Sequence, residues 1–133
     1  MILYFPIFSI TMPRYREPVK LTEMPMPHDP HYGRHSFGDI APKLGELTDE
    51  VLFGDIWQRP GLSPRERSIA TLAALIALNR TAQLPFHLAR AQDNGIDRAG
   101  IVELITHLAF YAGWPVAASA VTVLRELEGV PAP

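Results

Sequence analysis

A single stretch of about fifty residues, Gly61 to Gly113, contains three helical patterns in succession, each with its own start signal. The clearest start is SPRE at residues 63–66. Serine is a favoured N-cap, proline is favoured at the first helical position, and a glutamate three residues after the cap completes a capping box. The Ala- and Leu-rich sequence that follows predicts a helix to about Asn79. Its nearly all-round apolar character indicates burial on most sides, inside a bundle or at a subunit interface.

Two further helices are predicted downstream within this stretch. One covers residues 81–94 and ends at Gly95, and the next follows Asp97, a good N-cap residue. After the break at Gly113, Pro115 begins a last predicted helix, from Val116 to about Glu128.

Residues 36–57 form an earlier helical candidate, with Pro42 in a first turn and a restart near Thr48 as an alternative. No stretch shows the two-residue alternation that is typical of a strand. The sequence therefore predicts an all-α fold. We expect a small bundle of about five to six helices, in which short connections join antiparallel neighbours.

The N-terminal region differs in composition from the rest of the chain. Prolines recur throughout residues 1–35, which predicts an extended arm that precedes a single helical domain at residues 36–133. Its first ten residues, MILYFPIFSI, are largely apolar, and the N-terminus is interpreted as an upstream start before Met12, a signal peptide or an arm on a neighbouring subunit. His28, His31 and His35 lie in this arm. We expect loop histidines there, with a metal-ligand cluster as the alternative.

Composition excludes several classes of function. The 133 residues contain no cysteine, which rules out disulfides, thiolate metal sites and thiol redox chemistry. The net charge of −2 gives no basic surface for nucleic acid, and no apolar run reaches the roughly eighteen residues of a membrane span. A cytoplasmic protein without nucleic-acid or membrane partners is expected.

His87 is the strongest candidate for chemistry. On its predicted helix it shares one side with Arg80, Gln83 and Arg90. Nearby cations lower the pKa of a histidine and attract carboxylates, so this stripe can combine anion binding with proton transfer. A histidine on a solvated surface is the alternative.

A second polar stripe consists of Glu103, His107 and Tyr111. Glu103 and His107 are spaced for either a local helix pair or an acid–base dyad. Tyr111 and Trp114 could form a pocket wall or pack as ordinary aromatic side chains. The same alternatives hold for Trp57, and Arg59 beside it is a further candidate for an anion site.

The motifs RPGL at 59–62, HLARAQDNG at 87–95 and YAGWP at 111–115, in this order, resemble the carboxymuconolactone decarboxylase family over about Phe37 to Glu128. The resemblance implies an all-α fold of the alkylhydroperoxidase-D-like kind and a homo-oligomer, trimeric or hexameric. The cysteine positions of the peroxidase branch fall on Arg80 and Gln83, and its glutamate position falls on Ser68. Thiol peroxidase activity is therefore excluded, and the decarboxylase branch, which retains His87, is implied.

The resemblance implies a decarboxylase that needs no cofactor or metal and acts on a small carboxylated lactone such as 4-carboxymuconolactone, releasing CO2 to give the enol-lactone. His87 is then the proton donor or an orienting group. Arg67 is an alternative carboxylate ligand. The substrate-binding candidates are Arg80, Arg90, Trp57, Arg59, Tyr111, Trp114 and Glu103. A divergent member that binds or transforms another small ligand is the alternative, because Pro85, Phe86 and Trp114 depart from the family pattern.

Overall fold

The computed structural model describes residues 28–133, and in this part of the chain every regular element is helical, as the sequence predicts. The elements in chain order are α1 (Tyr32–Phe37), α2 (Pro42–Leu47), the π-helix η2 (Thr48–Phe53), the 3-10 helix η3 (Ile56–Gln58), α3 (Pro64–Ala77), α4 (Leu84–Asp93), α5 (Arg98–Ala112) and α6 (Trp114–Leu127). None of the helices in this part combines the length and apolar character that a membrane crossing requires.

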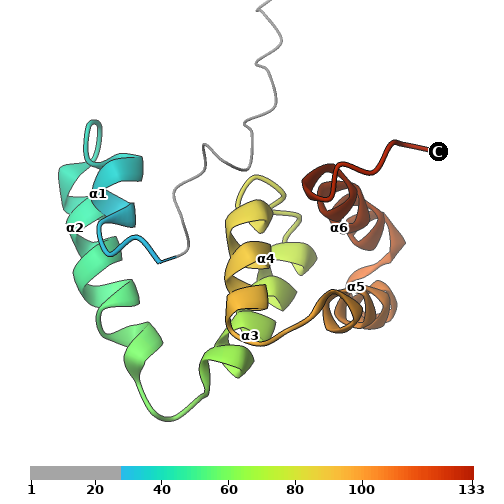
Figure 1. Cartoon of the computed structure of the whole chain (residues 1–133), viewed down its shortest axis with the longest axis horizontal. Coiled ribbons are helices and arrows are strands. Elements are labelled where there is room, and N and C mark those ends of the chain that lie inside the picture. Colours follow the sequence, from blue (N-terminus) through green and yellow to red (C-terminus); the bar gives the residue numbers. More distant parts are fainter. Residues whose placement is uncertain (1–27) are drawn as a thin grey trace, which may run out of the picture.

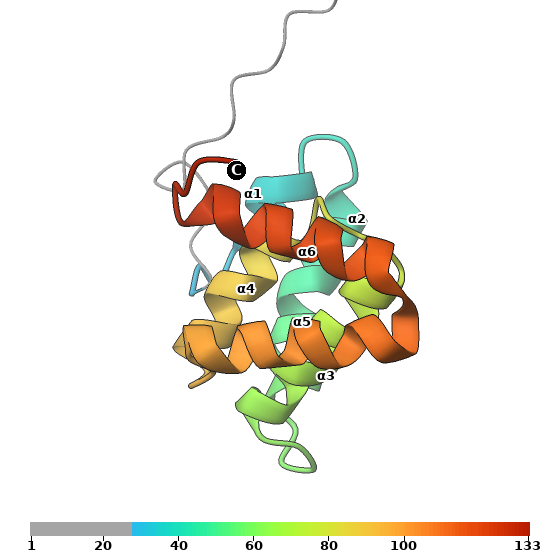
Figure 2. The ribbon, with the colours of Figure 1, turned by 90° about the vertical axis from the view of Figure 1, so that its right-hand side faces the viewer.

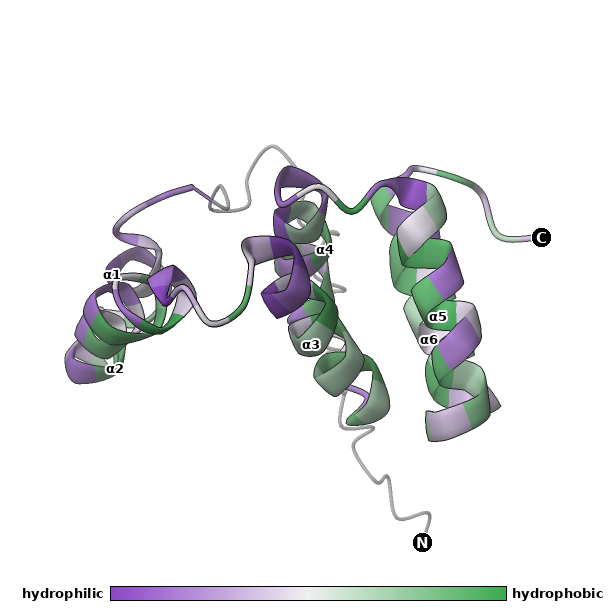
Figure 3. Cartoon of the chain, turned by 90° about the horizontal axis from the view of Figure 1, so that it is seen from below, coloured by the Kyte–Doolittle hydropathy of each residue, from purple (hydrophilic) through white to green (hydrophobic). Residues whose placement is uncertain are grey.

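The helices form three layers (Figures 1 and 3). The α1–α2 pair lies at one side, α3 and α4 lie in the middle, and α5 and α6 lie at the other side. The last two run antiparallel to each other, as Figure 2 shows, and both pack on the middle layer. The middle layer is therefore the only one of the three that contacts helices on both of its sides.

The main core lies between the middle layer and the α5–α6 layer. Leu72, Ile76, Leu84 and Ile101 are its fully buried large side chains, and they come from α3, α4 and α5. Each such side chain stabilises the fold by roughly 1.5–3 kcal/mol relative to an exposed one. Within one chain only Ser68, Leu72 and Ile76 of α3 are buried, so this helix is less enclosed than its composition predicts.

The predicted start and stop signals are confirmed. At the start of α3, the Ser63 amide donates to the Glu66 carboxylate at 2.7 Å and the Glu66 amide donates to the Ser63 hydroxyl at 3.2 Å. Asp97 caps α5 by accepting from the Gly100 amide at 2.8 Å. Gly95 ends the α4 segment at a φ of 89°, a conformation that favours glycine. These local signals fix where α3 and α5 begin and where α4 ends.

The structure corrects the prediction for the segment that precedes the bundle. Residues 32–35, expected in an extended arm, belong to helix α1, and the expected helix over 36–57 is divided into α1, α2, η2 and η3. The remainder of the expected arm, residues 1–27, lies outside the described residues. Pro30 precedes α1 and therefore does not disturb it, whereas Pro42 lies at the start of α2.

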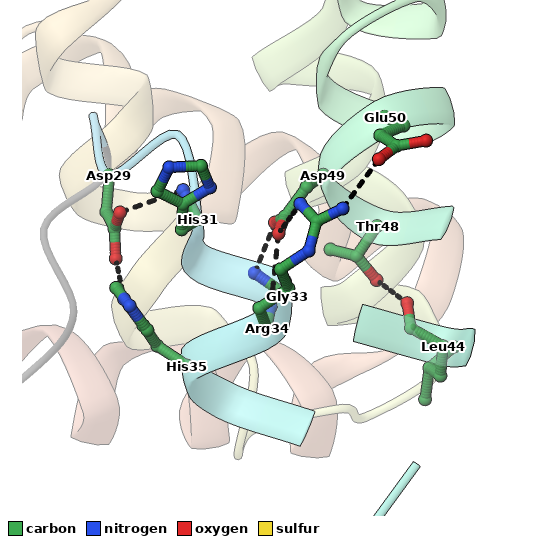
Figure 4. A network of polar contacts seen from close by, with 9 residues as sticks. All are labelled: Asp29, His31, Gly33, Arg34, His35, Leu44, Thr48, Asp49 and Glu50. Atoms are coloured by element: carbon green, nitrogen blue, oxygen red, sulfur yellow. Dashed lines mark hydrogen bonds and ion pairs between the residues drawn. The ribbon is translucent and has the colours of Figure 1, made fainter. Parts of the chain in front are cut away.

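The buried carboxylate of Asp49 explains why α1 forms despite its glycine (Figure 4). This carboxylate in η2 accepts the Gly33 amide at 2.5 Å, the Arg34 amide at 3.2 Å and the Arg34 guanidinium at 3.1 Å. It thus satisfies amide donors in the first turn of α1 that have no partner within the helix. Arg34 also bonds Glu50 at 2.5 Å. Nothing in the sequence spacing predicts this pairing across sixteen residues.

Gly33 lies where α1 crosses the start of η2, and only a residue without a side chain fits there. A Cβ at this position would lie 2.6 Å from the Thr48 Cβ and 2.7 Å from the Asp49 Oδ1. We expect Gly33→Ala to lower the free energy of unfolding by about 1–3 kcal/mol through overpacking. Chemical denaturation followed by circular dichroism measures this change.

Gly61→Ala is the matched control, because a Cβ at Gly61 would meet nothing within 4 Å. Its unfolding midpoint should stay close to that of the wild type. Equal stability of the Gly33 and Gly61 variants would contradict the close packing of α1 against η2.

Candidate functional site

His87 lies on α4, with its ring between aromatic side chains from two layers. The ring is stacked with that of Trp57 at a centroid distance of 6.3 Å and meets the ring of Phe86 edge-on at 5.0 Å. Trp57 belongs to η3, just before α3, and is buried. The imidazole is thus held at the junction of the N-terminal helices and the bundle, in an apolar setting with restricted freedom to turn.

This setting changes the protonation of His87. Burial, reinforced by the positive charge of Arg90, lowers the pKa of His87 from 6.5 to about 4. The side chain is therefore neutral near pH 7. Its Nδ1 is buried and makes no hydrogen bond to any of the described residues. A buried nitrogen of this kind has hydrogen-bonding capacity left over for a ligand.

Arg90 lies one helical turn after His87 and completes the group. Its guanidinium carbon lies 4.5 Å from the centre of the Phe53 ring and 4.6 Å from that of Trp57. Contacts of a guanidinium with aromatic faces are favourable and orient the planar group. Burial lowers the pKa of Arg90, but an arginine remains a cation at neutral pH.

A pocket of about 290 Å³ opens beside Arg90, between the N-terminal helices and α4. Phe53, Phe86 and Gln58 line its walls, and the Gln58 side-chain amide donates to the Phe53 carbonyl at 3.0 Å. The other lining residues are His28, Asp29, Pro30, Tyr32, Asp49 and Gly54. The pocket therefore combines aromatic walls, the cation of Arg90 and the carboxylates of Asp29 and Asp49, whereas His87 and Trp57 lie next to Arg90 and are not among the lining residues.

Of the predicted site residues, the structure brings together His87, Arg90 and Trp57. Arg80 lies exposed at the corner between α3 and α4, and Arg59 lies exposed after η3. Arg67, half-buried on α3, donates to the backbone carbonyl of Arg59 at 2.8 Å. None of these three arginines lines the pocket beside Arg90.

The second polar stripe lies elsewhere, on α5 and the start of α6. The His107 ring packs on that of Tyr111 at 4.8 Å, and among the described residues His107 forms no hydrogen bond or ion pair with Glu103. Tyr111 is 79% exposed. Trp114, 66% exposed, lines a different hollow of about 190 Å³ between α5 and α6. Within one chain, these residues therefore do not form a wall of the pocket beside Arg90.

Sequence reasoning missed Tyr32, Phe53 and Gln58 as pocket residues and noted Phe86 only as a departure from a family pattern. Tyr32 and Phe53 stand in segments whose course depends on contacts distant in the sequence. Phe53 ends a π-helix, an element that often occurs at functional sites but has no spacing signal of its own. The adjacent aromatic residues Phe86 and His87 were the one available signal.

The three N-terminal histidines contact other side chains of the described region: His28 and His35 each lie beside a carboxylate, and His31 packs against a ring. His28 Nε2 lies 3.2 Å from an Asp93 carboxylate oxygen, and His35 Nδ1 lies 2.7 Å from the Asp29 Oδ2. The His31 ring meets that of His35 edge-on at 6.1 Å. Across residues 28–133, nowhere do three histidine or acidic side chains come together closely enough to hold a metal ion.

Comparison with known proteins gives consistent matches. Residues 42–126 match the carboxymuconolactone decarboxylase family. A 4-carboxymuconolactone decarboxylase of Acinetobacter baylyi is 39% identical over 92 residues, which cover 69% of this chain and 69% of the relative. A nitrosuccinic acid decarboxylase of Metarhizium robertsii is 36% identical over 81 residues, or 61% of this chain and 57% of that relative.

Both relatives are named as decarboxylases, which are carboxy-lyases, and they support an enzyme of this type here. The family match spans most of the bundle and includes His87, Arg90 and Trp57. The chain belongs to the carboxymuconolactone decarboxylase family.

Proposed function

We propose that this protein decarboxylates a small carboxylic acid in the pocket beside Arg90, with His87 in proton transfer. The observation that carries the proposal is a half-buried, neutral imidazole close to a guanidinium that lines a small pocket. The names of the two relatives support a carboxylic-acid substrate. A carboxylated lactone, with 4-carboxymuconolactone as the first compound to assay, is the proposed substrate.

The reaction needs few groups from the protein. The bond between the carboxylate carbon and the neighbouring carbon breaks, CO2 leaves, and the electron pair passes into a conjugated carbonyl of the substrate as a dienolate. A proton then adds to carbon, so each turnover that releases CO2 consumes one proton. Arg90 holds and orients a substrate carboxylate, and the aromatic walls exclude water from the carboxylate that leaves.

His87 supplies the proton in this scheme. In the resting enzyme it is neutral because of burial and the charge of Arg90. An anionic substrate on Arg90 compensates that charge, which raises the pKa of His87 and favours uptake of a proton from solvent. The imidazolium then stands beside the developing carbanion, to which it transfers the proton.

We further propose a homo-oligomer, a trimer or a hexamer. Phe110, Tyr111 and Trp114 are large apolar or aromatic side chains that are exposed together where α5 meets α6. Exposed patches of this kind commonly become subunit interfaces. A cytoplasmic location and the absence of nucleic-acid partners remain predictions from composition.

The first test concerns His87 itself. We expect His87→Ala to lower kcat on the carboxylated lactone by about 10²–10⁴-fold, the usual contribution of a positioned acid or base. A spectrophotometric assay of lactone consumption measures it. His107→Ala is the matched control, because His107 is an exposed histidine on α5, and it should retain activity within about twofold. Full activity of His87→Ala would contradict the proposed role.

The second test separates the two arginines of the predicted stripe. Arg90→Gln removes the cation of the pocket, and we expect KM to rise about 10- to 100-fold, the equivalent of a lost charged hydrogen bond. Arg80→Gln changes an arginine outside the pocket and should leave KM within about twofold. The opposite ranking of the two variants would place the carboxylate site at the corner before α4.

The third test follows the proton. Above a pH of about 4 the protonated fraction of free His87 falls about tenfold per pH unit. A reaction that requires this proton therefore loses kcat/KM as pH rises.

Calorimetric titration with benzoate, in two buffers of different ionisation enthalpy at pH 6, should show uptake of up to about one proton per site. His87→Gln cannot titrate and should show almost none; equal uptake in both proteins would refute proton loading at His87.

A further inference from the structure

Tyr32 brings a neutral hydrogen-bond donor to the pocket beside Arg90. It lies at the start of α1, before residue 42, where the family match begins, and it lines the same pocket as Arg90. Its hydroxyl makes no hydrogen bond to any of the described residues. A phenol hydroxyl can both donate and accept a hydrogen bond. The pocket therefore contains, besides the cation of Arg90, a neutral donor that a bound ligand can use.

Aromatic contacts hold the ring of Tyr32 in place. It stacks on the Phe86 ring at a centroid distance of 4.2 Å, and it meets the rings of Phe37 and Phe53 edge-on at 6.2 and 6.1 Å. Stacked and edge-to-face ring pairs at such distances are favourable. The side chain is also half-buried. Because a ring in contact with three others has few rotamers available, its hydroxyl is a preorganised donor that a ligand need not order on binding.

Phe86 connects Tyr32 with the proposed proton donor. One ring stack joins Phe86 to Tyr32, and the ring of the next residue, His87, meets that of Phe86 edge-on at 5.0 Å. Arg90 lies one helical turn after His87 on the same helix, α4, whereas Tyr32 comes from α1. The guanidinium and the phenol therefore reach one pocket from two different helices, so each can bind a different part of the same substrate.

The carboxylates of Asp49 and Asp29, which also line the pocket, have donors of their own (Figure 4). Asp49 accepts two amides of α1 and the guanidinium of Arg34, whose positive charge offsets its own. Asp29 accepts the His31 amide at 2.8 Å. Neither carboxylate is hydrogen-bonded to the Tyr32 hydroxyl. Because carboxylates line this pocket, an oxygen that becomes negative there needs a directed donor, and the Tyr32 hydroxyl can serve as one.

We propose that Tyr32 is a further catalytic residue, whose hydroxyl donates a hydrogen bond to the substrate carbonyl oxygen that becomes negative when CO2 leaves. The electron pair of the broken carbon–carbon bond passes into the conjugated carbonyl, and its oxygen becomes the dienolate oxygen. Tyr32 keeps its proton throughout, and the carbon receives its proton from His87. A donor placed where charge develops stabilises the transition state more than the ground state. This role rests on the proposed function, since it belongs to the same reaction at the same site.

Tyr32→Phe removes the hydroxyl and keeps the ring that stacks on Phe86. We expect kcat on the carboxylated lactone to fall about 10- to 100-fold, at or below the usual cost of one lost oxyanion donor, with KM within about threefold of the wild type. The unfolding temperature should be unchanged, because the hydroxyl bonds none of the described residues. Thr122→Val is the matched control. It removes an exposed hydroxyl of α6 outside the pocket and should leave kcat within about twofold of the wild type.

A coloured probe tests the same hydrogen bond without turnover. 4-Hydroxy-3-nitrobenzoate offers a carboxylate to Arg90 and, at its other end, a phenol that ionises near neutral pH with a change in absorbance, so that its phenolate oxygen stands for the dienolate oxygen. A hydrogen bond from Tyr32 favours the ionised form. The apparent pKa of the bound probe should therefore be about 0.5–1 higher in Tyr32→Phe than in the wild type, the equivalent of one net hydrogen bond. Benzoate lacks this oxygen, and its dissociation constant should agree within about twofold between the two proteins.

The two measurements separate this inference from the proposed function. Full kcat of Tyr32→Phe, or equal ionisation of the bound probe in the variant and the wild type, would overturn the role of Tyr32 and leave decarboxylation standing. Ionisation of the probe that depends on the Tyr32 hydroxyl, in a protein that decarboxylates none of the lactones assayed, would uphold the donor and reject the reaction. Absence of probe binding would overturn both the donor at Tyr32 and the carboxylate site at Arg90.

Discussion

The contact of the Arg90 guanidinium with the rings of Phe53 and Trp57 is the interaction on which the candidate site depends. Phe53 and Trp57 come from two elements before α3, and Arg90 comes from α4, so this contact joins the N-terminal helices to the bundle. Such contacts contribute roughly 0.5–2 kcal/mol according to their desolvation. The same positive charge helps to keep His87 neutral. One side chain therefore connects the assembly of the pocket with its electrostatics.

The attachment of the N-terminal helices to the bundle also depends on a polar contact that is remote from His87. Asp49 accepts amides of α1 and thereby fixes that short helix against η2. Tyr32 on α1 then reaches the Phe86 ring. A helix of six residues is unstable by itself, so its order comes from such tertiary contacts. The order of the pocket wall thus follows from a buried carboxylate, two amides and one ring stack.

The parts of the fold with local signals could be predicted from the sequence, and the parts without them could not. The Ser63–Glu66 capping box and the Asp97 cap depend on residues within one helical turn, and both predictions are confirmed. The helix boundaries before Gln58 depend on a hydrogen bond from the Gly33 amide to the Asp49 carboxylate. These two residues are sixteen positions apart, and no spacing rule anticipates their contact. The candidate site divides in the same way. His87 and Arg90 are one turn apart on α4, so helical spacing anticipates their proximity, whereas Tyr32 and Phe53 are brought to the pocket by tertiary contacts.

The partial burial of His87 and Arg90 bears on the proposed binding of an anionic substrate. A half-buried imidazole and a half-buried guanidinium lie one helical turn apart on α4, and under the proposed function a bound carboxylate offsets the cost of their desolvation. Desolvation lowers the pKa of both His87 and Arg90, so their charged forms are less favourable than in water. A bound carboxylate beside them would raise the pKa of both His87 and Arg90. Under the proposed function, substrate binding would raise the pKa of His87 and so favour uptake of the proton that decarboxylation consumes.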